Sequence, residues 1–217
     1  MKGIYLVTDQ KACIENSFET IVSDAVKAGV CCVQLREKQA GTRLFLKKAL
    51  DLMSILKPAK IPLIINDRID IALAVNAQGV HLGQSDMPYT HARRLMGPSA
   101  IIGLSVETWK DVEKAQDLDV DYLGVSPVFS TPTKTDTKTP WGIKGLEKIS
   151  KYSCHPLVAI GGINESNAQK IIKAGAHAIA VVSAICSSKN AFDATRQLVN
   201  LFEKSQQFEK NQQGEKS

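Results

Sequence analysis

Residues 61–86 read IPLIINDRIDIALAVNAQGVHLGQSD. Two short apolar runs, 63–65 and 79–82, flank the stretch 69–75, which is long enough for only about two helical turns. Neither run alternates apolar with polar residues, and this is typical of a strand that is buried on both faces. The stretch therefore predicts two parallel strands joined by a short crossover helix, with polar residues directly after each strand.

The same unit recurs along the chain. Eight short apolar runs lie at residues 4–7, 32–35, 63–65, 79–82, 101–104, 122–125, 157–160 and 178–182. Apolar residues at helical spacing lie at 17–28, 42–57, 69–75, 107–118, 145–152, 165–174 and 191–204. Parallel strands need such crossover helices, so we predict an α/β protein with a single (β/α)8 barrel, the TIM barrel. An open doubly wound sheet is the competing architecture, and it is less favoured because the pattern has no topological break.

Length and composition fit one globular domain. The chain has 217 residues, of which 44% are hydrophobic and 23% charged. We place the catalytic barrel at residues 1–203. Residues 204–217, rich in Gln, Glu and Lys, are expected to form a disordered tail. The connection 126–143 is dense in Thr, Pro and Lys, and a loop of that length is usually functional or disordered.

Several classes of partner are not expected. The net charge is +5, but Lys and Arg are spread out and aromatics make up only 6%, so no nucleic-acid partner is predicted and a small anion is favoured. The five cysteines form no C-x-x-C pair, which is typical of free thiols in a reducing cytoplasm. No charged-then-apolar leader and no apolar stretch of about 18 residues is present. We therefore expect a cytoplasmic protein without a membrane segment.

Polar residues follow the second apolar run in an alternating pattern. Gln34 and Arg36 point to one side of the strand, and Lys38 comes just beyond its end. An inward-facing Arg is costly to bury unless it meets an anion. Together the three side chains form a natural clamp for phosphate oxygens. The alternative is a structural ion pair between Arg36 and Glu37 or another carboxylate.

Acidic residues follow two neighbouring runs. Asp67 comes shortly after the third run and Asp86 shortly after the fourth. Two carboxylates that face one cavity suit Mg²⁺, which keeps several waters and binds substrate phosphates. The alternative for either residue alone is a helix N-cap. Asn66 could hydrogen-bond a phosphate or a heterocycle.

The last runs indicate a second anion site. Gly161 and Gly162 follow the seventh run and Ser183 follows the eighth, where barrels commonly form a phosphate cup, although a tight turn explains the glycines equally well. Ser105 is expected to hydrogen-bond a ligand, because no Ser-His-Asp triad is evident. A metal-assisted site suits a diphosphate and a metal-free site suits a monophosphate. The pattern thus suggests that two phosphorylated small molecules are joined with loss of pyrophosphate.

An ordered set of motifs resembles the thiamine-phosphate synthase family from residue 4 to about residue 202. The motifs are Tyr5-Leu6-Val7-Thr8-Asp9, Gln34-Leu35-Arg36-Glu37-Lys38, Asn66-Asp67-Arg68, His81-Leu82-Gly83-Gln84, Thr131-Pro132-Thr133-Lys134 and Gly161-Gly162-Ile163. The resemblance implies a Mg²⁺-dependent transferase of thiamine biosynthesis. It would condense hydroxymethylpyrimidine diphosphate with hydroxyethylthiazole phosphate, giving thiamine phosphate and pyrophosphate by a dissociative substitution. One departure is Ser85, where the family commonly has an acidic residue.

The resemblance also implies roles for single residues. Those implied to hold the pyrimidine diphosphate are Gln34, Leu35, Arg36, Glu37, Lys38, Asn66, Ser105 and Lys134. Those implied to receive the thiazole phosphate are Thr131, Pro132, Thr133, Gly162, Val182 and Ser183. Asp67 and Asp86 would bind Mg²⁺. Arg36, Lys38 and Lys134 would be the catalytic residues, because they would take up the charge of the leaving pyrophosphate.

Two alternatives to the synthase remain. A thiazole tautomerase on the same barrel would need the phosphate cup but no complete diphosphate–metal site. A barrel without catalytic activity could bind thiamine intermediates as a sensor, although a metal pair would be unusual in a mere binder. The sequence does not decide the oligomeric state, and a homodimer stays open.

Overall fold

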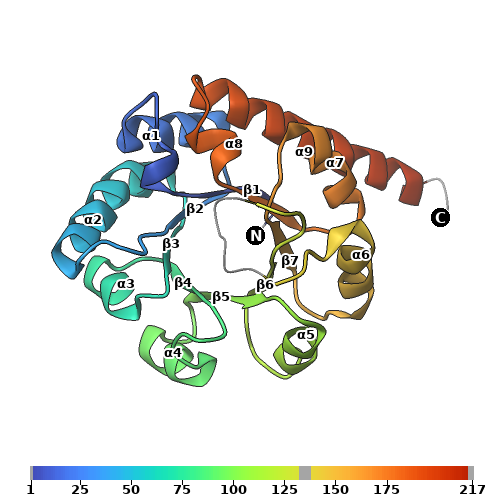
Figure 1. The fold of residues 1–217 in the computed structure, drawn as a ribbon, viewed down its shortest axis with the longest axis horizontal. Helices are drawn as coiled ribbons and strands as arrows, with labels where there is room; N and C mark the ends of the chain where they lie inside the picture. Colours follow the sequence, from blue (N-terminus) through green and yellow to red (C-terminus); the bar gives the residue numbers. More distant parts are fainter. Residues whose placement is uncertain (1, 132–137, 215–217) are drawn as a thin grey trace.

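The computed structural model describes residues 2–131 and 138–214, with side chains as far as residue 207. Its strands form one closed parallel barrel in chain order, as predicted (Figure 1). The strands are β1 (Gly3–Val7), β2 (Cys32–Leu35), β3 (Leu63–Asn66), β4 (Gly79–Leu82), β5 (Ile101–Val106), β6 (Tyr122–Val125), β7 (Leu157–Ile160) and β8 (Ala178–Val181). The barrel closes where β1 pairs with β8, with Tyr5 opposite Ala180.

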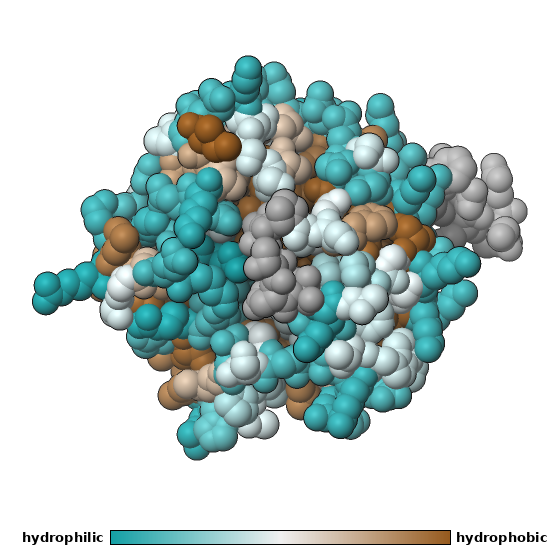
Figure 2. All heavy atoms as spheres, in the orientation of Figure 1, coloured by the Kyte–Doolittle hydropathy of each residue, from teal (hydrophilic) through white to brown (hydrophobic). Residues whose placement is uncertain are grey.

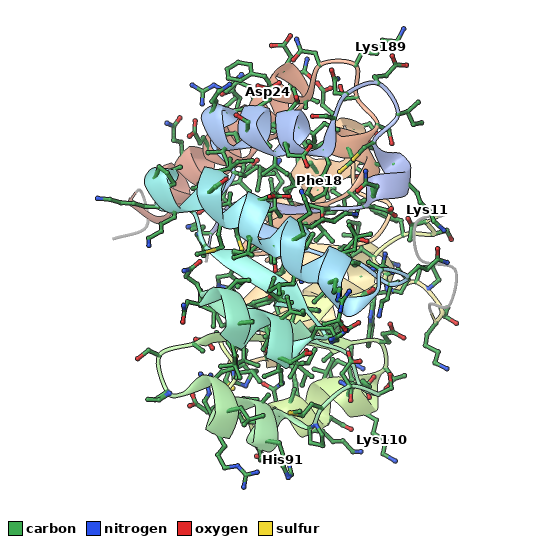
Figure 3. All side chains as sticks on the ribbon, turned by 90° about the vertical axis from the view of Figure 1, so that its left-hand side faces the viewer. Lys11, Phe18, Asp24, His91, Lys110 and Lys189 are labelled. Atoms are coloured by element: carbon green, nitrogen blue, oxygen red, sulfur yellow. The ribbon has the colours of Figure 1, made fainter. Side chains whose placement is uncertain are left out.

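Helices surround the barrel. They are η1 (Gln10–Ala12), α1 (Phe18–Ala28), α2 (Thr42–Ala59), α3 (Ile69–Val75), α4 (Tyr89–Met96), α5 (Trp109–Ala115), α6 (Gly142–Tyr152), α7 (Glu165–Lys173), α8 (Ser183–Cys186) and α9 (Ala191–Gly214). Figure 3 shows α1 to α4 side by side. Phe18, at the start of α1, is buried, whereas His91 on α4 is exposed. Among the described residues, no helix combines the length and the apolar character that a membrane crossing requires.

The strands are buried on both faces, which explains why their residues do not alternate. Side chains such as Tyr5 and Tyr122 point into the barrel, where they form one buried cluster with Ile64 and Val158. Their neighbours along each strand, such as Leu6, pack outward against the helices in a second cluster. Because successive side chains of a strand point to opposite faces, the same alternation decides which residues can reach the mouth of the barrel.

Helix α9 is longer than the sequence pattern indicates. It runs from Ala191 to Gly214, past residue 203, where we expect the barrel domain to end (Figure 1). It packs against α1 and α7, and both Phe202 and Ser205 are buried. The Ser205 hydroxyl donates to the Leu201 carbonyl, so the helix satisfies this polar side chain internally. The division into a barrel domain and a disordered tail stays a prediction.

Candidate active site

A cavity of about 850 Å³ lies at the carboxyl ends of the strands, a size that suits small-molecule ligands. Every strand contributes to its wall, either directly or through the residue that follows it. One lining residue for each strand in order is Val7, Gln34, Asn66, His81, Ser105, Ser126, Ile160 and Ala180. Figure 2 shows hydrophilic side chains gathered near the middle of this face of the barrel. The position agrees with the rule that barrel enzymes react at this end.

The predicted clamp of β2 is assembled at this cavity. Gln34, Arg36 and Lys38 all line it, as their alternation along the strand predicts. The end of β2 is held in place by the residue after β1, because the Arg36 backbone N–H donates to the Thr8 hydroxyl over 3.2 Å. The clamp therefore places one amide and two cationic groups on one wall.

Two residues between the clamp positions do not line the cavity. Leu35 is fully buried among the residues that pack against the helices. The Glu37 carboxylate pairs with the Lys48 ammonium of α2, with 2.6 Å between Oε1 and Nζ. Period two along the strand directs both side chains outward, away from the substrate positions that the resemblance implies for them. The ion-pair partner of Glu37 is thus Lys48, and the alternative of a structural pair between Glu37 and Arg36 is wrong.

The two predicted metal ligands lie together on the neighbouring strand ends. The Asp67 Oδ2 atom accepts a hydrogen bond from Lys38 Nζ over 2.6 Å, and Asp86 Oδ2 accepts one from the Gly83 N–H over 2.6 Å. Burial raises the pKa of the Asp86 carboxyl, and the neighbouring Asp67 carboxyl raises it further. The two acidic groups therefore repel each other within one wall of the cavity.

Neither carboxylate caps a helix, so the structural alternative for them does not hold. The N-cap of α3 is Arg68 and the N-cap of α4 is Pro88. Asp67 instead has a left-handed φ of 63°, which turns the chain sharply after β3. Its backbone N–H donates to the His81 carbonyl over 2.9 Å and so continues the pairing with β4.

The donor set fits Mg²⁺. Hard carboxylate oxygens are the ligands this ion prefers, and a divalent cation would offset both the burial and the neighbouring Asp67 carboxyl that raise the pKa of Asp86. Within residues 2–131 and 138–207, no cluster of three or more His, Cys, Asp and Glu side chains could hold a metal. A pair is sufficient for Mg²⁺, because this ion usually keeps waters and binds substrate phosphates at its other positions.

The opposite wall is built from backbone. Gly161 and Gly162 have left-handed φ values of 105° and 64°, and both line the cavity together with Val182 and Ser183. A Cβ on Gly162 would lie 2.7 Å from the Ser130 carbonyl oxygen, so the two loops approach each other more closely than any side chain would permit. The predicted cup residues of β7 and β8 are thus brought together on one side.

The loop after β6 is described only in part. Thr131 lines the cavity, whereas the predicted site residues Pro132, Thr133 and Lys134 lie outside the described residues. Lys138, on the far side of that gap, also lines the cavity and was not among the predicted contacts.

A hydrogen-bonded chain below the cavity was missed by the sequence analysis. Gln34 Nε2 donates to the Tyr5 hydroxyl over 3.1 Å, and the hydroxyls of Tyr5 and Tyr122 lie 3.0 Å apart. His81 joins Tyr122 through Nδ1 at 3.0 Å and Ser105 through Nε2 at 2.8 Å. A buried phenol usually needs a polar partner. That need is the only signal in the sequence, and it does not say which residue supplies the partner.

Comparison with known proteins gives a consistent result. A family model described as thiamine monophosphate synthase matches residues 4–185. The chain belongs to this family. The thiamine-phosphate synthase of Albidiferax ferrireducens is 55% identical over 92% of this chain and 91% of its own length. The thiamine-phosphate synthase of Leptospira biflexa is 51% identical over 93% of this chain and 98% of its own length.

A solved structure of a family member supports the same assignment. The thiamine phosphate pyrophosphorylase from Pyrococcus furiosus superposes with a TM-score of 0.85 at 34% identity, covering 94% of this chain and 96% of that one. Membership of the thiamine monophosphate synthase family confirms the resemblance seen in the motifs. The relatives are named thiamine-phosphate synthase, which is a transferase. They give no support to the tautomerase or to the sensor.

Proposed function

We propose that the protein condenses 4-amino-2-methyl-5-(diphosphooxymethyl)pyrimidine with 4-methyl-5-(2-phosphooxyethyl)thiazole, giving thiamine phosphate and pyrophosphate. One observation carries the proposal: a wall of cationic and acidic side chains and a wall of glycine backbone line the same cavity of about 850 Å³. The first wall suits a metal-bound diphosphate, and the second suits a monophosphate. Family membership supports the reaction.

The side-chain wall would bind the diphosphate. Arg36 and Lys38 would pair with its oxygens, and Gln34 and Asn66, which also line the cavity, would hydrogen-bond the rest of the molecule. Because these cations stand where negative charge develops on the leaving pyrophosphate, they would stabilise departure more than binding. By the resemblance, Lys134 would add a third cation from the loop after β6.

Asp67 and Asp86 would hold Mg²⁺, which when bound would supply further positive charge to the leaving group. The Gly83 N–H orients Asp86, and the Lys38 ammonium orients Asp67. Before the substrate arrives, the ammonium also balances part of the negative charge of the two carboxylates. Lys38 therefore has two partners in turn: the Asp67 carboxylate first, and a diphosphate oxygen afterwards.

The backbone wall would bind the thiazole phosphate. Gly162, Val182, Ser183 and Thr131 line it, and the resemblance adds Pro132 and Thr133. The thiazole nitrogen would attack the carbon from which pyrophosphate departs, forming the new C–N bond. No protein nucleophile is needed for this step. For the protein as a whole we further propose a cytoplasmic location, and a homodimer stays a prediction.

Product formation by the purified protein tests the proposal. Both substrates are supplied with Mg²⁺ or with EDTA, and thiamine phosphate is measured after oxidation to its fluorescent thiochrome. We expect product only with both substrates and the metal. Full turnover in EDTA would contradict the metal assignment. Conversion of the thiazole phosphate alone would indicate the tautomerase, and binding of both substrates without product would indicate the sensor.

A further inference from the structure

The buried chain below the cavity crosses the interior of the barrel. It runs from Gln34 on β2 through Tyr5 on β1 and Tyr122 on β6 to His81 on β4 and Ser105 on β5. Its middle is sealed from solvent, since Tyr5 and Tyr122 are each only 1% exposed. Both ends, Gln34 and Ser105, line the cavity, as does His81. The chain thus connects two substrate-facing side chains through phenols that never reach the substrate.

Glycines make room for this chain. Gly103 on β5 stands in register between His81 and Tyr122, and a Cβ there would lie 2.0 Å from Tyr122 Cζ. A Cβ on Gly124 would lie 2.8 Å from His81 Cε1. Without side chains at these positions, the Tyr122 ring crosses β5 and stacks on the imidazole, with ring centroids 5.6 Å apart. The space is therefore occupied by the two hydrogen-bonded rings.

Gln34 sets the first bond of the chain, because its amide nitrogen can only donate and the Tyr5 oxygen therefore accepts there. The Tyr5 hydroxyl has two further partners, Cys32 and Tyr122. With its proton directed to the Tyr122 oxygen, 3.0 Å away, the chain runs from Gln34 toward His81. The single proton of Tyr122 then points to His81 Nδ1, which must accept it. The ring proton of a neutral His81 is consequently on Nε2 and donates to the Ser105 oxygen.

Burial keeps both phenols protonated, so each has one proton to donate. It raises the pKa of both the Tyr5 and the Tyr122 phenol well above the ordinary value, so both keep their protons at neutral pH. The Ser105 oxygen accepts from His81, and its own hydroxyl proton is left to donate toward the cavity.

We propose that Tyr5 and Tyr122 are positioning residues that fix the Nε2–H tautomer of His81 and thereby make Ser105 a hydrogen-bond donor to the substrate. The inference rests on the proposed function only in naming the acceptor, a ring nitrogen of the aminopyrimidine. The relative size of the two tyrosines' effects follows from their positions in the chain of hydrogen bonds. Tyr122 contacts His81 directly, whereas Tyr5 acts one bond further away.

The tautomer can be measured without substrate. In protein labelled with ¹⁵N-histidine, the His81 signals are identified by their loss in His81→Asn. At about pH 8.5, where an ordinary imidazole is neutral, we expect a protonated Nε2 and a bare Nδ1. Tyr122→Phe should give a mixture of the two tautomers. A wild-type His81 with its proton on Nδ1 would overturn the proposal, because the chain would then run in the opposite direction.

Kinetics supply the second readout. Tyr122→Phe keeps the ring and should lower kcat/KM for the pyrimidine diphosphate about tenfold, while KM for the thiazole phosphate stays within about twofold. Tyr5→Phe should have a smaller effect in the same direction. Tyr152→Phe, which removes the hydroxyl of an exposed tyrosine, is the matched control and should behave as wild type. Equal kinetics for Tyr122→Phe and Tyr152→Phe would reject the positioning role.

The two readouts separate this inference from the proposed function. An inactive wild type with the Nε2–H tautomer would reject the proposed reaction while supporting the direction of the chain. An active wild type with the Nδ1–H tautomer would support the proposed reaction and reject the proposed direction of the chain.

Discussion

The two walls of the cavity, which we propose bind two different anions, are built by different means. The wall at β2–β4 uses charged side chains, with Arg36 and Lys38 beside the carboxylates of Asp67 and Asp86. The wall at β7–β8 uses backbone, because Gly161 and Gly162 have left-handed φ values that favour glycine. The first wall can therefore lose one charge at a time, whereas the glycines of the second can be changed only by altering the path of the chain.

This difference predicts different kinetic failures. In the proposed reaction, charges on the first wall act on a leaving group whose charge grows in the transition state, so their removal should lower kcat. The backbone of the second wall would hold a phosphate that does not react. Disturbing it should raise KM for that substrate with little effect on kcat.

The largest effect is expected at the carboxylate pair. Asp67→Asn preserves shape and tolerates the left-handed φ of 63°, but it removes the negative charge. We expect kcat at saturating Mg²⁺ to fall by about 100-fold or more, as for the loss of one strong electrostatic group. Thermal unfolding should show a folded variant. A rate within about twofold of wild type would contradict the role of Asp67.

A smaller effect is expected at the glycine wall. Gly162→Ala forces a side chain into a left-handed backbone and against the Ser130 carbonyl, 2.7 Å away. KM for the thiazole phosphate should rise about tenfold, and the free energy of unfolding should drop by about 1–3 kcal/mol.

Gly97→Ala is the matched control for that variant. Gly97 also has a left-handed φ, of 84°, but a Cβ there would meet no atom within 4 Å. The variant should lose about 1–3 kcal/mol of stability, because this φ with a ψ of 171° is a conformation that glycine adopts almost alone, and both KM values should be unchanged. If the two alanine variants shift KM equally, the close approach at Gly162 has no bearing on substrate binding.

The smallest effect on catalysis is expected outside the cavity. Glu37→Gln breaks the pair with Lys48, whose side chain is 14% exposed, and should cost about 1–3 kcal/mol of stability. Because Glu37 faces α2, kcat and both KM values should stay within about twofold of wild type. A tenfold rise in KM for the pyrimidine diphosphate would show that Glu37 does reach the substrate.

The sequence predicts those features that depend on local periodicity. Runs without alternation indicate doubly buried strands, and period two places Gln34, Arg36 and Lys38 on one side. The same period directs Leu35 and Glu37 outward, although the resemblance implies that they hold substrate. Helix α4 was not predicted, because it has only eight residues and Ala92 is its one buried residue; its apolar stripe of Tyr89, Ala92 and Met96 is short and only partly buried.

Other features depend on contacts that no local pattern specifies. Tyr5 and Tyr122 are 117 residues apart in sequence, and closure of the barrel brings their hydroxyls together. Within a strand each of them reads as an ordinary core residue. The left-handed turn at Asp67 likewise follows from pairing with His81 of the next strand.

The difference between the two walls is tested most directly by binding each substrate separately in a calorimeter, with Mg²⁺ and with EDTA. We predict that the pyrimidine diphosphate binds at least about tenfold more weakly in EDTA, because Asp67 and Asp86 then hold no metal for it. The thiazole phosphate should bind equally well in both conditions. Metal-independent binding of the diphosphate, or equal metal dependence of both substrates, would contradict the account.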